Sequence, residues 1–286
     1  MRGYVELLRP PNVTTALADV LAGYGAAGLG YPQRLGWLLG ATACLYGGGV
    51  VLNDYFDRRL DAVERPERPI PSGRVRPSAA AAFGGSLLAV GVVFAHRATL
   101  EAAFVAAAIA LLAVLYDRWS KHHALAGPVN MGACRGLNLL LGVAAVPAAL
   151  AERWELAVLP FLYIWAVTVV SRGEVHGGRS SAAMFALAAL TGVFIALLAL
   201  AIQSTAGRTA ALVLTLLLAW RVGPPFWRAS SDPRPAIIRH AVRTGVLSLV
   251  LLDAALSAVY AGTWYALIVL SAALLAGWLA RQFAVT

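Results

Sequence analysis

Apolar runs of about 20 residues recur along almost the whole chain, and this repetition restricts the possible folds more than any other feature. A helix of that length crosses a hydrocarbon core of roughly 30 Å. Charged residues make up only 13% of the sequence, about half of their usual share in soluble domains. The runs are nearly unbroken rather than alternating, which excludes a β-barrel. We therefore predict an all-α integral membrane protein that forms a single domain over residues 1–286.

The spans and the distribution of basic residues predict the orientation in the membrane. We expect spans at residues 12–30, 35–54, 78–95, 100–116, 128–150, 156–171, 181–202, 208–222, 242–260 and 263–280. The turn between the last two is so short that nine spans remain an alternative to ten. Ten spans place 18 of the 23 Lys and Arg residues on one side and four on the other, with Arg135 inside a span. Basic residues accumulate on the cytoplasmic side. We thus expect both termini and the long connections to be cytoplasmic, in a cell inner membrane.

The net charge, the cysteines and the first residues say little about function. The net charge of +9 follows from the basic cytoplasmic connections, so no nucleic-acid partner is expected. Cys44 and Cys134 lie in apolar runs and form neither a metal-binding pattern nor a disulfide framework. The first residues, "MRGYVELLRPPN", carry charges but no apolar signal region, so no cleaved signal peptide is expected.

The stretch "NDYFDRRLDAVERPERPIPSG", residues 53–73, gathers carboxylates at the end of the second predicted span. Asp54, Asp57 and Asp61 are spaced i, i+3, i+7, so on a helix continuing from that span they share one face. Asn53 is expected beside Asp57 by the i, i+4 relation. Carboxylates on one stripe repel each other unless a cation lies among them, and Mg²⁺ prefers such oxygen ligands. Acidic residues do nothing for membrane orientation, so the pattern indicates a metal site.

Basic residues follow directly in the same connection. Arg68 and Arg74 lie in a segment stiffened by Pro66, Pro69 and Pro71. Guanidinium groups match phosphate oxygens with paired hydrogen bonds, so both arginines are candidates for binding a phosphate group. For the arginines alone, an ordinary basic cytoplasmic loop explains the pattern at least as well.

These motifs together resemble the UbiA superfamily of intramembrane prenyltransferases. "NDYFDRRLD" is similar to the first aspartate-rich motif of that family, "RPERPIPSG" to its continuation, and "LLRPPN" to the segment before its first span. "YDRWSKHHALAGPVNMG" is similar to the family's tyrosine-to-lysine connection, which here contains Tyr116 and Lys121. The resemblance implies a helical bundle around a central cavity with polar cytoplasmic caps. It also implies that the aspartates hold Mg²⁺ against an isoprenyl diphosphate, whose allylic C–O bond ionises before an acceptor captures the carbocation.

The connection after the sixth predicted span departs from the family pattern. "VVSRGEVHGGRSS", residues 169–181, holds one acid, Glu174, where the family has two or three. Arg172, His176 and Arg179 surround it, and its glycines permit close backbone approach. A phosphate or anion site that includes Glu174 as a metal ligand is one interpretation, and a glycine-rich turn is the other. Within the superfamily, this segment looks like that of the UbiA-like protein encoded in the bacterial ebo gene cluster.

Polar residues inside the spans are a third group of candidates, since ionisable groups are costly at membrane depth. Arg135 and Asn138 lie one turn apart and could line a substrate cavity below the metal. The equal alternative is an interhelical hydrogen bond or salt bridge, from Arg135 to Asp19 or Asp253. The ring of Tyr116 could face a developing carbocation, although a tyrosine at a span end is more often an interfacial anchor.

Two functions compete on this basis. The favoured one is Mg²⁺-dependent transfer of an isoprenyl group from a lipid diphosphate to a polar or aromatic acceptor inside the membrane. The other is a weakly catalytic or non-catalytic binder or transporter of a lipid-linked metabolite. The second motif, which has a single acid, favours the binder. The intact first motif and Lys121 favour the enzyme.

Overall fold

The structure is a computed structural model that describes residues 2–271, and the regular elements of this part of the chain are all helices. Its elements are α1 (Arg2–Leu8), α2 (Pro10–Ala26), α3 (Pro32–Glu64), α4 (Pro77–Ala98), α5 (Leu100–Arg118), η1 (Ser120–His122), α6 (Ala126–Val143), α7 (Pro147–Arg153), η2 (Trp154–Ala157), α8 (Val158–Ser171), α9 (Ser180–Gln203), α10 (Arg208–Ser231) and α11 (Pro235–Ala261). A further helix begins at Thr263 and continues through Ser271.

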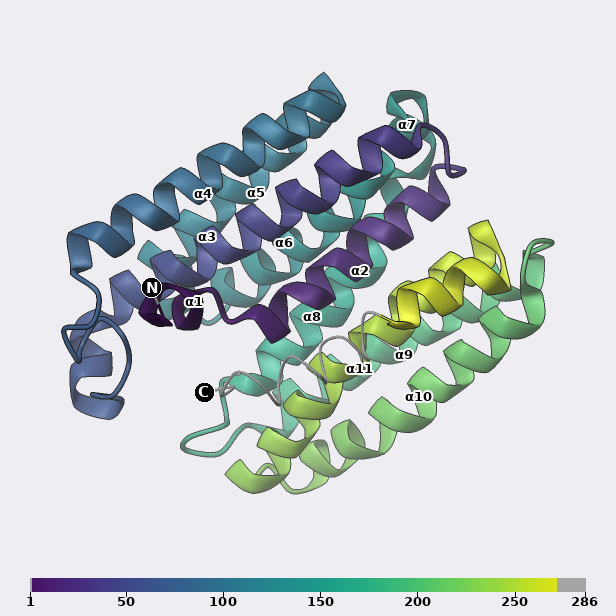
Figure 1. Ribbon diagram of the computed structural model, residues 1–286. Coiled ribbons are helices and arrows are strands. Elements are labelled where there is room, and N and C mark those ends of the chain that lie inside the picture. Colours follow the sequence, from purple (N-terminus) through teal and green to yellow (C-terminus); the bar gives the residue numbers. More distant parts are fainter. Residues whose placement is uncertain (1, 272–286) are drawn as a thin grey trace.

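The long helices lie side by side in one bundle with two groups (Figure 1). The first group contains α2 to α6, with α4 packed along α3. The second contains α8 to α11, in which α10 packs against both α9 and α11. The contacts of α2 with α11 and of α6 with α8 join the two groups. Residues from both halves of the sequence therefore meet along these central helices.

Local sequence signals explain where the helices begin. Five of them, α2, α3, α4, α7 and α11, start at a proline, which has the φ angle of a helix and lacks an amide hydrogen that the first turn could not use. Thr99 caps α5 instead, since its hydroxyl accepts a hydrogen bond from the amide of Ala102 at 3.0 Å. Short connections with strong start signals keep consecutive helices adjacent.

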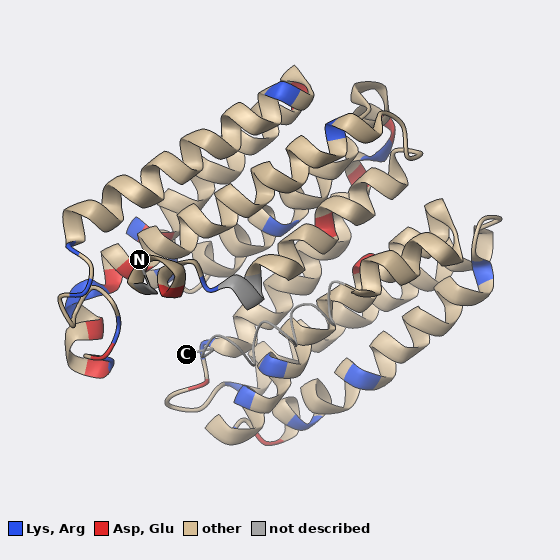
Figure 2. Ribbon diagram, viewed as in Figure 1, with Lys and Arg blue, Asp and Glu red and all other residues tan. Residues whose placement is uncertain are grey.

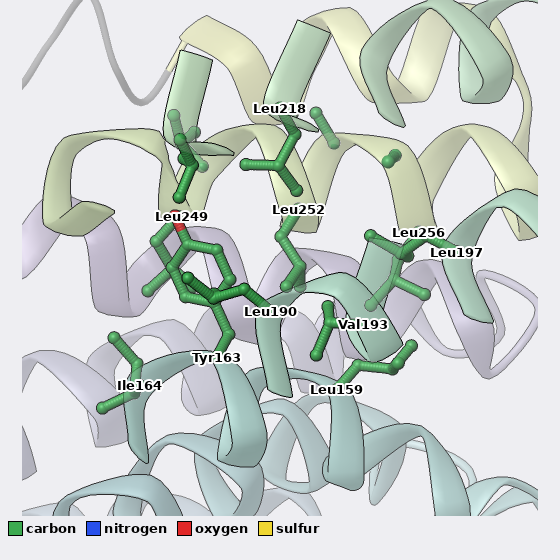
Figure 3. Close-up of a cluster of buried hydrophobic side chains, with 14 of the residues drawn as sticks. Leu159, Tyr163, Ile164, Leu190, Val193, Leu197, Leu218, Leu249, Leu252 and Leu256 are labelled. Carbon is green, nitrogen blue, oxygen red and sulfur yellow. The ribbon is translucent and has the colours of Figure 1, made fainter. Parts of the chain in front are cut away.

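Large side chains fill the interior of the second group (Figure 3). Leu190, Leu218, Leu249 and Leu252 come from α9, α10 and α11 and are fully buried. Tyr163 of α8 lies among them, and its hydroxyl donates to the carbonyl of Gly245 at 2.8 Å. This bond satisfies the hydroxyl in an apolar environment, where an unpaired one costs about 1–3 kcal/mol.

Helices α2 and α6 cross in very close contact in the centre of the bundle, and each contributes a glycine to the crossing. A Cβ atom at Gly23 would collide with the carbonyl oxygen of Leu139, and one at Gly142 would collide with that of Val20. Each glycine therefore lets the backbone of the opposite helix touch it directly. Small residues have this role at helix interfaces in membranes.

Each of the first nine predicted spans overlaps a helix, although several of the predicted ends differ. Among residues 2–271, seven helical segments are long and apolar enough to cross a membrane by themselves: α3, α4, α5, residues 147–171, α9, α10 and α11. The fifth predicted span, 128–150, is wrong at its end, because α6 stops at Val143 and Pro147 starts α7. The eighth was too short, since α10 continues through Pro224 and Pro225. The tenth starts as predicted, but its second half lies outside the described residues. The all-α membrane fold is confirmed.

Candidate active site at the mouth of the bundle

Charged residues gather at helix ends and connections, with few along the middles of the helices (Figure 2). The first predicted cluster lies on the last turns of α3, which continues unbroken to Glu64. Asp54 and Asp61 are buried, and the side chain of Asp57 is 25% exposed. The predicted helical continuation, which places these aspartates on one stripe, is therefore confirmed.

Arg68 brings the following connection back onto this stripe. Its Nη1 donates to Asp61 Oδ2 at 2.8 Å and lies 3.4 Å from Asp54 Oδ1. The hydroxyl of Ser72 donates to the carbonyl of Arg68 at 2.7 Å and stabilises the turn. The Nε of Arg68 is buried and finds no acceptor within the described part of the chain. Arg74, in contrast, lies outside the cluster, where it pairs with Glu6 at 2.5 Å.

Arg9 is a second cation at this position, and sequence reasoning did not identify it. It precedes α2 with φ 45° and ψ 62°, a left-handed conformation that is uncommon for residues other than glycine. Its Nη2 reaches Asp54 Oδ1 at 2.5 Å. The only available signal was the arginine before two prolines in "LLRPPN", because a following proline excludes helical geometry at the preceding residue.

Lys121 approaches the stripe from the opposite side. It belongs to η1, the short helical turn that follows α5. Its Nζ contacts Asp57 Oδ1 at 2.5 Å, and its side chain is 11% exposed. Tyr116 is half-buried near the end of α5. The predicted tyrosine-to-lysine connection is therefore next to the aspartate stripe.

Asp117 is a fourth carboxylate at the mouth, and it was also missed. It is buried, and its Oδ1 accepts a hydrogen bond from Asn53 Nδ2 at 2.9 Å. Asn53 lies one turn before Asp57 on α3, as predicted, but its side-chain amide bonds to Asp117 of α5. An acid beside Tyr116 at a membrane mouth was the signal that could have identified Asp117, since acids have no role in membrane orientation.

Only part of the predicted second connection, residues 172–179, lies near the aspartate cluster. Arg172 donates to the carbonyls of Lys121 and His123, both at 3.3 Å. Glu174 is half-buried, and burial raises its pKa above the usual value, although Arg239 acts in the opposite direction. His176 and Arg179 are exposed. The structure therefore places Arg172 beside Lys121, and Glu174 beside Arg239 of α11.

Arg135 and Asn138 lie deeper, on α6. Arg135 Nη1 pairs with Asp19 Oδ2 at 3.0 Å, and its Nη2 donates to Thr15 Oγ1 at 2.8 Å. Asn138 donates to Asp19 Oδ2 at 2.8 Å and accepts from Thr42 Oγ1 at 2.7 Å. The structure therefore contains the interhelical salt bridge that was one of the two alternatives for Arg135.

The carboxylates do not form a ready-made metal cage. Within residues 2–271, no group of three His, Cys, Asp or Glu side chains is placed to hold a metal ion by itself. Asp54, Asp57 and Asp61 are instead each turned to an arginine or lysine. Mg²⁺ commonly takes only one or two protein carboxylates and completes its octahedron with phosphate oxygens and water. The residues present fit that arrangement.

The sequence pattern of the UbiA prenyltransferase family matches residues 13–241, which include all of the candidates predicted from the sequence but not Arg9. The chain belongs to the UbiA prenyltransferase family. It is accordingly a multi-pass integral membrane protein. A digeranylgeranylglyceryl phosphate synthase of Natronomonas pharaonis is 38% identical over 152 residues, which are 53% of this chain and 55% of that protein. The match thus spans little more than half the length of this relative.

Solved structures of the family show the same fold. One described as digeranylgeranylglyceryl phosphate synthase in membranes has a TM-score of 0.72 at 21% identity, over 91% of this chain and 98% of the other. A UbiA homologue from Archaeoglobus fulgidus, bound to DMAPP and Mg²⁺, has a TM-score of 0.57 at 15% identity, over 94% and 99%. The expected likeness to the ebo-cluster protein finds no support here, because the similar curated protein reported above is a digeranylgeranylglyceryl phosphate synthase.

Proposed function

We propose that this protein transfers an isoprenyl group from an isoprenyl diphosphate to a nucleophilic acceptor at the mouth of the bundle. The observation that carries the proposal is the convergence of Arg9, Arg68 and Lys121 on three carboxylates. The buried Nε of Arg68 adds a donor without an acceptor, which is costly unless an anion completes it. A diphosphate supplies such oxygen atoms.

In the proposed site, Asp54, Asp57 and Asp61 are the carboxylates that would hold Mg²⁺ together with the diphosphate. When bound, Mg²⁺ supplies positive charge that stabilises the departing diphosphate. Glu174 was a further candidate ligand, but it lies beside Arg239, so we assign it no metal contact.

The cations of the chain have a separate role in binding and orienting the donor. Arg9 and Lys121 contact carboxylates at the mouth, and we propose that they exchange these contacts for phosphate oxygens. Arg172 lies against the η1 turn and adds positive charge on the same side. Arg74 and Arg179 are exposed and have at most a weaker, long-range effect on donor binding.

The proposed reaction breaks the allylic C–O bond of the donor, and its electron pair leaves with the diphosphate. A bond then forms between that carbon and the acceptor atom, which loses its proton. Preorganised cations are effective here because charge grows on the leaving oxygen in the transition state. Tyr116 is proposed to face the developing carbocation, while the buried aspartates keep the arginines in position.

The relatives narrow the first substrates to test. Since a similar protein is named digeranylgeranylglyceryl phosphate synthase, we propose an acceptor alcohol that carries a phosphate head group, and a long-chain donor. Arg135 and Asn138 were predicted to contact substrate. Their side chains are engaged with Asp19, so we propose that they shape the interior instead. The site is proposed to face the cytoplasm.

The alternative, a binder or transporter of a lipid-linked diphosphate, is favoured by the single acid of the second connection. Release of inorganic diphosphate by the purified protein distinguishes the two, with Mg²⁺, geranylgeranyl diphosphate and a glyceryl phosphate lipid. The enzyme releases diphosphate only with Mg²⁺ and yields a prenylated acceptor. Saturable donor binding without diphosphate release across donors and acceptors of different lengths would favour the binder.

A further inference from the structure

Two acids meet far from the mouth, where α2 packs against α11. Asp19 of α2 and Asp253 of α11 are both completely buried. Their carboxyl groups lie within hydrogen-bonding reach of each other. Ser257, one turn beyond Asp253 on the same face of α11, is also completely buried. The proposed reaction uses none of these residues.

The available hydrogen-bond donors do not satisfy this group. Oδ2 of Asp19 accepts from Arg135 and Asn138. Oδ1 of Asp19 and both oxygens of Asp253 have no donor among the residues that the structure describes, and the hydroxyl of Ser257 has no partner there either. Buried carboxylate oxygens without a donor cost several kcal/mol each on general grounds.

Other polar groups around Asp253 are engaged elsewhere. The hydroxyl of Tyr163 on α8 donates to the carbonyl of Gly245. Arg221 on α10 donates through Nε to Ser248 at 3.1 Å. Tyr46 on α3 is close enough to interact electrostatically with Arg135 and Asp19. Arg135 is therefore the one cation that forms an ion pair with this group in residues 2–271.

We propose that Asp19 and Asp253 form a proton-binding site, in which a single proton is shared between the two carboxyl groups. Without a proton, the two carboxylates face each other with acceptors only. One proton makes one carboxyl group a hydrogen-bond donor to the other. It also removes the surplus charge, because two carboxylates and one guanidinium would otherwise leave one negative charge inside the membrane. A metal cation fits less well, since Arg135 already occupies one side of Asp19 and repels it.

The shared proton has a structural consequence for the two groups of helices. It creates a hydrogen bond from α2 to α11, two helices that lie at opposite ends of the sequence. The residue just before α2 is Arg9, which contacts Asp54 at the mouth. The proton therefore fixes the helix that positions one of the proposed diphosphate ligands.

Infrared spectroscopy of the purified protein tests the proton directly. The difference between the wild type and Asp253→Asn at neutral pH is expected to contain the C=O stretch of a protonated carboxyl, shifted in D₂O. Glu155→Gln, which removes an exposed acid from η2, is the matched control and should lack that band. Absence of the band from the wild-type difference would overturn the proposal.

Thermal unfolding provides a second measurement that does not depend on one variant. If the folded state holds a proton that the unfolded state releases, the melting temperature of the wild type falls as pH rises above the ordinary pKa of an aspartate, about 4. Asp253→Asn retains a donor towards Asp19 and should flatten this dependence. Asp253→Leu should lower the melting temperature more than Asp253→Asn. Stabilisation by Na⁺ at constant ionic strength, with no carboxyl band, would identify a cation site and contradict the shared proton.

Discussion

The polar cluster at the mouth and the polar cluster inside the bundle use similar residues in opposite ways. At the mouth, Asp54, Asp57 and Asp61 each contact a cation on a connection or helix end, and Arg68 has a donor to spare. Inside, one guanidinium serves two acids: Arg135 pairs with Asp19, and both oxygens of Asp253 have no donor among the described residues. An unpaired hydrogen-bond donor, as at the mouth, can bind an incoming anion. Unpaired carboxylate oxygens, as in the interior, can bind a proton.

The surroundings differ in the same sense. The mouth is partly accessible, as the side chain of Arg9 is 25% exposed, while Asp19 is completely buried. Charges at the mouth can exchange partners with a substrate at modest cost, because water still reaches them. Charges inside cannot, since separating a buried pair costs roughly 3–5 kcal/mol. We therefore expect substitutions at the mouth to affect activity and substitutions inside to affect stability.

The largest effect is expected at the mouth. Asp57→Asn should lower kcat/KM for diphosphate release by about 100-fold or more, because it removes a charge that binds Mg²⁺ and positions Lys121. The melting temperature should change little, since Asp57 is partly exposed. Glu64→Gln, an exposed acid at the end of the same helix, is the control. Activity and Mg²⁺ dependence equal to the wild type would remove Asp57 from the site.

The interior cluster should respond in the opposite way. Asn138→Ala removes bonds to Asp19, Thr42 and the carbonyl of Ala16, so we expect a loss of about 2–4 kcal/mol in unfolding free energy. The measurement is thermal unfolding in detergent, with exposed Gln203→Ala as the control. Unchanged stability, together with weaker substrate binding, would show that Asn138 contacts substrate as the sequence suggested.

A smaller effect should separate two arginines of the second connection. Arg172→Ala should raise the Kd of a donor analogue about 3- to 10-fold at saturating Mg²⁺, because it removes a cation beside Lys121. Arg179→Ala should have less effect: both side chains are exposed, but Arg172 is held against the η1 turn by hydrogen bonds to the carbonyls of Lys121 and His123. Isothermal titration with a non-hydrolysable donor analogue gives both values. Equal losses would mean that the connection closes over the donor.

Glu174 should give the smallest effect. Its pKa is raised by burial, so the folded state binds the proton more tightly than the unfolded state, and stability falls as pH rises above the usual range of a glutamate. Glu174→Gln should remove this dependence and shift the melting temperature by only about 1–2 °C, because the group is half-exposed. Its activity should exceed that of Asp57→Asn. A loss as large as that of Asp57→Asn, with one fewer bound metal, would restore Glu174 as a metal ligand.

Local patterns in the sequence were enough for the helices and for the aspartate stripe. The i, i+3, i+7 spacing of Asp54, Asp57 and Asp61 depends only on helical geometry, and the helix does continue to Glu64. Contacts between distant segments were not accessible in this way. Arg9 meets Asp54 across 45 positions, and no periodicity relates the two.

One missed contact and one error have identifiable physical causes. The spacing placed Asn53 beside Asp57 on one helix, but it could not reveal the bond from Asn53 to Asp117, which lies on another helix. The break before Pro147 was overlooked because apolar composition continues through it, although proline marks a helix start. The salt bridge from Arg135 to Asp19 was one of two predictions of equal weight, since burial of a charge demands a partner but does not name it.

The reciprocal contact of Gly23 and Gly142 constrains how the protein admits a long-chain lipid. Because the backbones of α2 and α6 already touch, neither helix can roll or slide against the other without a collision. The route of a lipid tail into the bundle must therefore open between other pairs of helices. We therefore expect this crossing to stay fixed when a long-chain donor enters, so that the mouth keeps its alignment.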